Sequence, residues 1–88
     1  MEQIKRMIAE GKVKESISRL TELIEGGAVP LDECFYLRGN AYRKLGQTRL
    51  ALNDYLEAIA LNPDSPAATA YRMQIRILDF YNKDMYNQ

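Results

Sequence analysis

The chain has 88 residues, and its 12 Lys and Arg side chains balance 12 Asp and Glu side chains. A chain of this length forms one small domain. The even charge provides no basic stripe for nucleic acid, and the absence of His removes the commonest general base and metal ligand. Because no secretory h-region and no apolar run of membrane-spanning length is found, we expect a cytoplasmic protein with no membrane partner.

Helical periodicity runs along the whole chain, and no alternating run indicates a strand. Glycine and proline interrupt it at four places: Gly11, Gly26 to Pro30, Gly46 and Asn62 to Pro66. The sequence therefore predicts five helices, at about 2–10, 13–25, 31–45, 48–61 and 66–84. Short loops between them imply antiparallel neighbours that pack in sequence order.

Small and aromatic side chains recur at fixed offsets in segment 32–65. The motif reads Phe35-x2-Arg38-Gly39-x2-Tyr42-x8-Ala51-x3-Tyr55-x2-Ala58 and closes with Asn62-Pro63. This spacing closely resembles a tetratricopeptide (TPR) repeat, a helix–turn–helix module of about 34 residues. The resemblance implies a protein that acts by binding other proteins through a helical surface.

The chain also resembles itself at a spacing of 35 residues. Gly11 falls on Gly46, Ser16 on Ala51 and Leu20 on Tyr55. The family resemblance implies an all-α fold, a right-handed α-α superhelix of two TPR helix pairs and a C-terminal capping helix. Within this single domain we expect a degenerate first repeat at 1–31, a well-formed repeat at 32–65, the capping helix at 66–84 and a tail at 85–88.

The resemblance also implies roles for the residues of the motif. Gly39 and Ala51 are expected where the third and fourth helices approach closely, and Ala58 where the fourth meets the last. The large rings of the motif are expected to fill the spaces between helices. These are Phe35, Tyr42 and Tyr55, while Pro63 ends the fourth helix. Arg38 stands where the pattern prefers Leu, and we expect its guanidinium to reach water.

In this family the first helix of each repeat lines a concave surface that usually binds peptides. The candidates for a peptide groove are Lys5, Tyr36, Asn40, Arg43 and Gln74. The alternative is a solvated face of ordinary helix-forming residues. The two-carboxylate clamp of chaperone-binding TPR domains is not expected, because Tyr36 replaces its Lys, and Ala67 and Tyr71 replace its later Lys and Arg.

The last predicted helix is apolar well beyond the needs of a cap. Its polar stripe is narrow and consists of Arg72, Arg76, Asp79 and Lys83. The candidates for a docking or self-association interface are Tyr71, Ile75, Leu78, Phe80, Tyr81, Met85 and Tyr86. In the alternative, the tail folds back over the groove of the first repeat.

No constellation of residues predicts chemistry. Cys34 is a single cysteine, which we expect to be a packing residue. Asp32, Glu33, Asp54 and Glu57 are expected on exposed helix turns, without a nucleophile, metal set or phosphate loop. We therefore expect no enzyme, no cofactor and no metal.

A protein or peptide partner of unknown identity is the leading expectation, and a homodimer is one candidate. One alternative is an accessory or assembly subunit docked permanently on a larger enzyme complex. A remote alternative is a nucleic-acid-binding helical repeat using Arg43, Lys44, Arg72 and Arg76.

Overall fold

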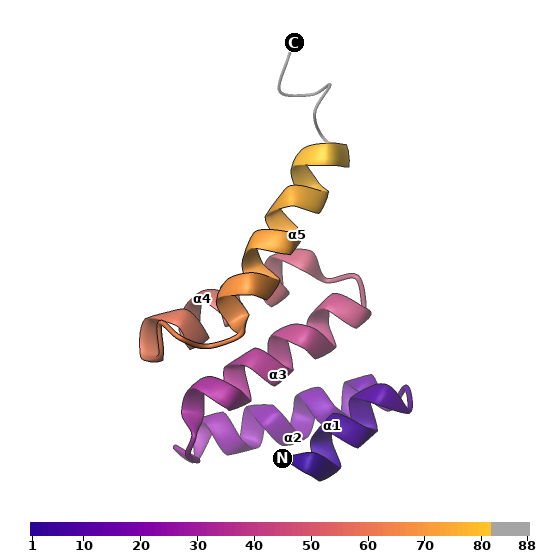
Figure 1. Ribbon diagram of the computed structural model, residues 1–88. Helices are drawn as coiled ribbons and strands as arrows, with labels where there is room; N and C mark the ends of the chain where they lie inside the picture. The colour runs from indigo at the N-terminus through magenta and orange to yellow at the C-terminus, as the bar shows by residue number, and fades with distance from the viewer. Residues whose placement is uncertain (82–88) are drawn as a thin grey trace.

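The computed structural model describes residues 1–81, and over that range it contains five helices and no strand. The helices are α1 (Glu2–Ala9), α2 (Val13–Glu25), α3 (Leu31–Lys44), α4 (Thr48–Leu61) and α5 (Ala67–Tyr81). The predicted all-α fold is confirmed, and the helix bounds agree with the predicted ones to within one residue up to the start of α5. Figure 1 shows the helices following one another through the molecule in chain order, with α5 at the opposite end from α1 and α2.

Local signals account for the ends of the helices. Gly46 follows α3 with φ of +77°, the left-handed region in which a residue without a Cβ has no steric penalty. At the start of α5, the Ala67 amide donates to Ser65 Oγ over 3.1 Å, as expected of a serine cap. The loop before α5 is held to the start of α3, because Asn62 Nδ2 donates to Asp32 Oδ2 over 3.1 Å.

Two apolar clusters fill the interior, and α3 contributes to both. The first joins the N-terminal helices to α3 through Ile4, Ile8, Val13, Leu20, Cys34, Leu37 and Ala41. The second joins α4 to α5 through Ala51, Tyr55, Ala58 and Ala67, with Phe35 and Tyr42 of α3 packed against it. The expected packing of Ala58 against the last helix is thus confirmed.

Helices α3 and α4 approach closely at Gly39. A Cβ placed on Gly39 would lie 2.7 Å from Cε1 and 2.8 Å from Cδ1 of the Tyr55 ring, and 3.3 Å from the Ala51 carbonyl oxygen. The ring and Ala51 are fully buried, so neither has room to withdraw. The expected small-residue contact between these helices is therefore confirmed.

The expectation that the Arg38 guanidinium reaches water is wrong. Its Nε donates to Asp54 Oδ2 over 2.7 Å and its Nη2 to Asp54 Oδ1 over 2.8 Å, while Nη1 donates to Thr21 Oγ1 over 3.1 Å. The guanidinium carbon also lies 5.6 Å from the ring centre of Phe35 and 5.7 Å from that of Tyr42. Arg38 thereby joins α2, α3 and α4.

The same contacts correct the prediction of an exposed Asp54. The Arg38 and Asp54 side chains are only 17% and 6% exposed. Hydrogen bonding to Asp54 raises the pKa of Arg38 above its ordinary value, so the guanidinium keeps its charge. A bidentate pair of this kind satisfies both partners where solvent reaches them poorly.

Helix α5 packs on α4 through one face, on which Ala67 and Gln74 are buried. Figure 1 shows the C-terminal half of α5 extending away from the other four helices. The described part of α5 therefore does not cover the first two helices. The tail at 85–88, to which the fold-back alternative refers, lies outside the described residues. Met85 and Tyr86 lie outside the described residues.

Candidate functional site

Two adjoining hollows lie between α1 and α3. One has a volume of about 340 Å³ and is lined by Lys5, Ile8, Tyr36, Leu37 and Asn40. The other, of about 230 Å³, is lined by Lys5, Asp32, Glu33, Tyr36, Ser65 and Pro66. Because Lys5 and Tyr36 line both, we treat them together as the α1–α3 groove. The structure thus brings together three of the five predicted groove residues, Lys5, Tyr36 and Asn40.

The charge of Lys5 is balanced within the groove. Its Nζ lies 3.2 Å from Glu2 Oε1 and 3.5 Å from Glu33 Oε1. The hydrogen bond to Glu2 raises the pKa of Lys5, so the amine keeps its proton. With Asp32 also on the wall, the groove does not present the surplus positive charge that a carboxylate ligand requires.

The Asn40 amide is oriented by the core. Tyr55 donates its hydroxyl proton to Asn40 Oδ1 over 2.6 Å, and the Tyr36 ring lies 6.2 Å from the Tyr55 ring, centre to centre. Burial raises the pKa of Tyr55, which keeps this hydroxyl protonated and able to donate. The arrangement leaves Asn40 Nδ2 available to donate to a carbonyl group placed in the groove.

The other two predicted groove residues, Arg43 and Gln74, do not line the groove. Arg43 is exposed in the last turn of α3 and lines neither hollow. The prediction that Gln74 faces the groove is wrong, because the residue is only 8% exposed and shares the packed face of α5 with Ala67, seven residues earlier. Lys44, next to Arg43, donates from Nζ to the Ile8 carbonyl over 3.0 Å and so holds the end of α1 against α3.

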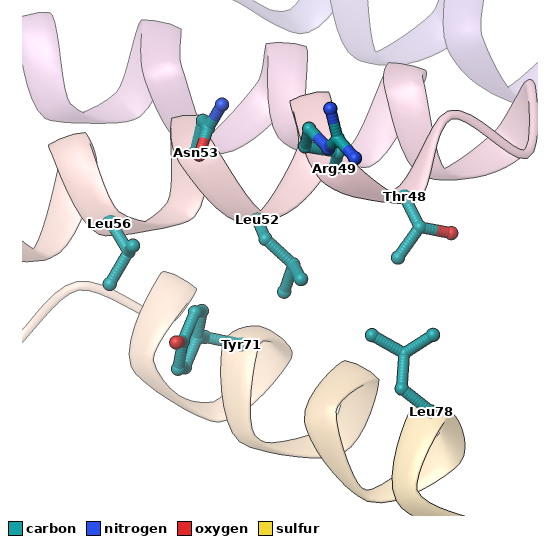
Figure 2. Close-up of a pocket in the computed structure, with 7 residues that line it drawn as sticks. All are labelled: Thr48, Arg49, Leu52, Asn53, Leu56, Tyr71 and Leu78. Carbon is teal, nitrogen blue, oxygen red and sulfur yellow. The ribbon is translucent and has the colours of Figure 1, made fainter. Parts of the chain in front are cut away.

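A second surface, between α4 and α5, was not predicted from the sequence. Its hollow of about 460 Å³ is lined by Thr48, Arg49, Leu52, Asn53, Leu56, Tyr71 and Leu78. In Figure 2, Leu52 and Leu56 of α4 lie across from Tyr71 and Leu78 of α5, while Arg49 and Thr48 stand toward one end. The leucines at 52 and 56, one helical turn apart and outside the repeat motif, were the signal that could have indicated it.

A third surface lies on the exposed side of α5. Met73, Ile77, Phe80 and Tyr81 are 54%, 46%, 76% and 77% exposed, and we call them the α5 stripe. Their spacing of four, three and one residues places them on one side of the helix. Of the predicted interface residues, Phe80 and Tyr81 belong to this stripe, Tyr71 and Leu78 line the α4–α5 hollow, and Ile75 is half-buried.

The chemically capable side chains are occupied in packing. Cys34 is fully buried, and burial raises the pKa of its thiol, so it contributes to the core as predicted. Within residues 1–81, no three or more Cys, Asp or Glu side chains gather in a way that could hold a metal ion. No helix in this part of the chain has the length and apolar character needed to cross a membrane.

Stacked helix pairs joined by short loops, with a hollow between first helices, define a helical-repeat protein of the kind that binds other proteins. The family model of the tetratricopeptide repeat matches residues 33–65. The chain is also similar to the Bacteroides fragilis protein BF1650, solved by solution NMR, at 52% identity and a TM-score of 0.87. That similarity covers 99% of this chain and 88% of the other. A search of the curated proteins finds no match. The chain belongs to the tetratricopeptide-repeat proteins.

Proposed function

We propose that this chain is a bacterial, cytoplasmic protein-interaction module that holds an extended segment of another protein in the α1–α3 groove. TPR proteins are in general non-enzymatic binding modules, and the proposal assigns the chain no catalytic role or cofactor. The observation that carries it is the Asn40 amide, whose oxygen is held by Tyr55 while its Nδ2 remains available beside Tyr36 and Lys5. We assign α1 and α2 to a degenerate first repeat, α3 and α4 to a well-formed repeat and α5 to the cap.

The chemistry of the groove indicates the kind of segment it fits. Asn40 Nδ2 would donate to a backbone carbonyl, and the half-buried Tyr36 ring offers a surface for a side chain. Lys5 is paired with Glu2 and Glu33, so an acidic C-terminus would find its charge already neutralised. We therefore propose an internal, neutral or basic segment as the ligand.

The α5 stripe supports a second mode of association within the same function. An exposed apolar patch with two adjacent aromatic rings usually marks an interface. Either a second copy or a larger complex would cover such a patch. Nucleic acid is less well supported, because Lys44, one of the four cations considered for it, is bound to the Ile8 carbonyl.

Photo-crosslinking tests the groove. With a photoreactive phenylalanine analogue at Tyr36, we expect a discrete crosslinked partner from a lysate of the source cell, and none with the analogue at the exposed Lys14 on α2. Asn40→Asp keeps an acceptor for Tyr55 but removes the donor, so it should reduce crosslinking about tenfold, the effect of one lost hydrogen bond.

Two results would count against the groove. One is equal labelling from positions 36 and 14. The other is crosslinking that Asn40→Asp leaves unchanged although the variant retains the helical circular dichroism of the parent.

A further inference from the structure

We infer that two copies of this chain pair through the α5 stripe, with their α5 helices antiparallel and crossing at Ile77. This inference rests on the second mode of association in the proposed function and names its partner. Met73, Ile77 and Phe80 lie on a different side of α5 from the buried face of Ala67 and Gln74. Tyr81, seven residues after Gln74, continues the line of that face but is 77% exposed, so pairing would leave the packing of α5 on α4 intact.

The exposed area is sufficient for a specific contact. Aromatic side chains cover about 150–250 Å² each, so the four side chains of the stripe leave on the order of 500 Å² uncovered per copy. Pairing two copies would bury roughly 1,000 Å², near the lower limit for a specific interface. The stripe therefore meets that limit before any neighbouring residue is counted.

The position of α5 favours an antiparallel pair. Its C-terminal half stands clear of the other helices in Figure 1, so a second helix has room beside it. An antiparallel arrangement places the two bodies of α1 to α4 at opposite ends of the pair, whereas a parallel one places them side by side. With Ile77 at the crossing point, Met73 of each copy lies level with Tyr81 of the other.

Charge neither selects nor opposes the arrangement. Arg72, Arg76 and Asp79 are exposed, and at about 100° per residue Arg76 lies roughly 100° and Asp79 roughly 160° around α5 from Ile77. Asp79 therefore points away from the second copy, and exposed charges beside the contact contribute little to the stability of the pair. The chain carries no net charge that would oppose self-association.

Sedimentation and cysteine crosslinking test the pair on the full chain. From about 1 µM to about 1 mM, a range that covers weak dimers, we expect the mass to rise from one copy toward two. Ile77→Glu should keep it at one copy, while Thr69→Glu, exposed on α5 outside the stripe, should not. Under oxidised glutathione, Ile77→Cys should form disulfide-linked dimers at least tenfold faster than Thr69→Cys, because only residue 77 lies at the crossing point.

A parent chain that remains one copy throughout, or a dimer unaffected by Ile77→Glu, would overturn the inference. Failure here is separable from failure of the groove, since an Ile77→Glu monomer should still crosslink from Tyr36, and Asn40→Asp should still dimerise.

Discussion

Asp54→Ala is expected to lower the free energy of unfolding by about 3–5 kcal/mol, the usual effect of leaving one partner of a buried ion pair alone. The reason is the position of Arg38, whose guanidinium would keep its place between two aromatic rings and lose both carboxylate hydrogen bonds. Urea unfolding followed by circular dichroism measures the change. A domain of this size has little stability to spare, so the variant should be partly unfolded at 37 °C.

The double substitution Arg38→Leu with Asp54→Leu is the matched control. It removes both charges together and places at position 38 the residue that the repeat pattern prefers. Apolar replacement of a whole buried pair is often neutral or stabilising. We therefore expect a free energy of unfolding within about 1 kcal/mol of the parent's value, or above that value. A double variant as unstable as Asp54→Ala would show that the pair itself, and not the isolated charge, decides the stability.

Gly39→Ala is the second large expected effect. The new Cβ would lie 2.7 Å from the fully buried Tyr55 ring, and overpacking of this kind destabilises a protein by about 1–3 kcal/mol. Alanine is the better helix former by about 1 kcal/mol, which offsets only part of that loss. We therefore expect a lower melting temperature, by about 4–8 °C for each net kcal/mol.

Tyr55→Leu provides the control for Gly39→Ala because it removes the two ring atoms nearest the new methyl group. The double variant Gly39→Ala with Tyr55→Leu should lose less stability than the two single variants lose in sum. Such coupling is expected of residues in contact. A Gly39→Ala variant that melts above the parent would show that the helices separate easily at this contact.

Much of the fold follows from features that act over short distances in sequence. Gly46, Pro63 and the Ser65 cap mark helix ends because each restricts or satisfies its own backbone. The contact of Gly39 with Ala51 and Tyr55 also follows, since offsets within a repeat determine which residues face each other.

The sequence-based predictions are wrong where the rotation of a helix about its axis decides whether a side chain is buried or exposed. Arg38 and Asp54 are 16 residues apart on different helices, and only the packed arrangement shows that their side chains meet below the surface. Gln74 was predicted to face the groove, but α5 buries that position on the same face as Ala67. The hollow lined by Leu52 and Tyr71 likewise depends on how α4 and α5 face one another.

A peptide titration followed by NMR decides whether the α1–α3 groove is the binding surface. The peptide is one selected from a random display library on the intact protein, added to ¹⁵N-labelled chain. We predict shift changes at the backbone amides of Lys5, Tyr36 and Asn40 and at the Asn40 side-chain NH₂, all of which border the groove. Changes confined to the α4–α5 hollow or the α5 stripe, with the Asn40 side chain unmoved, would contradict peptide binding in the groove.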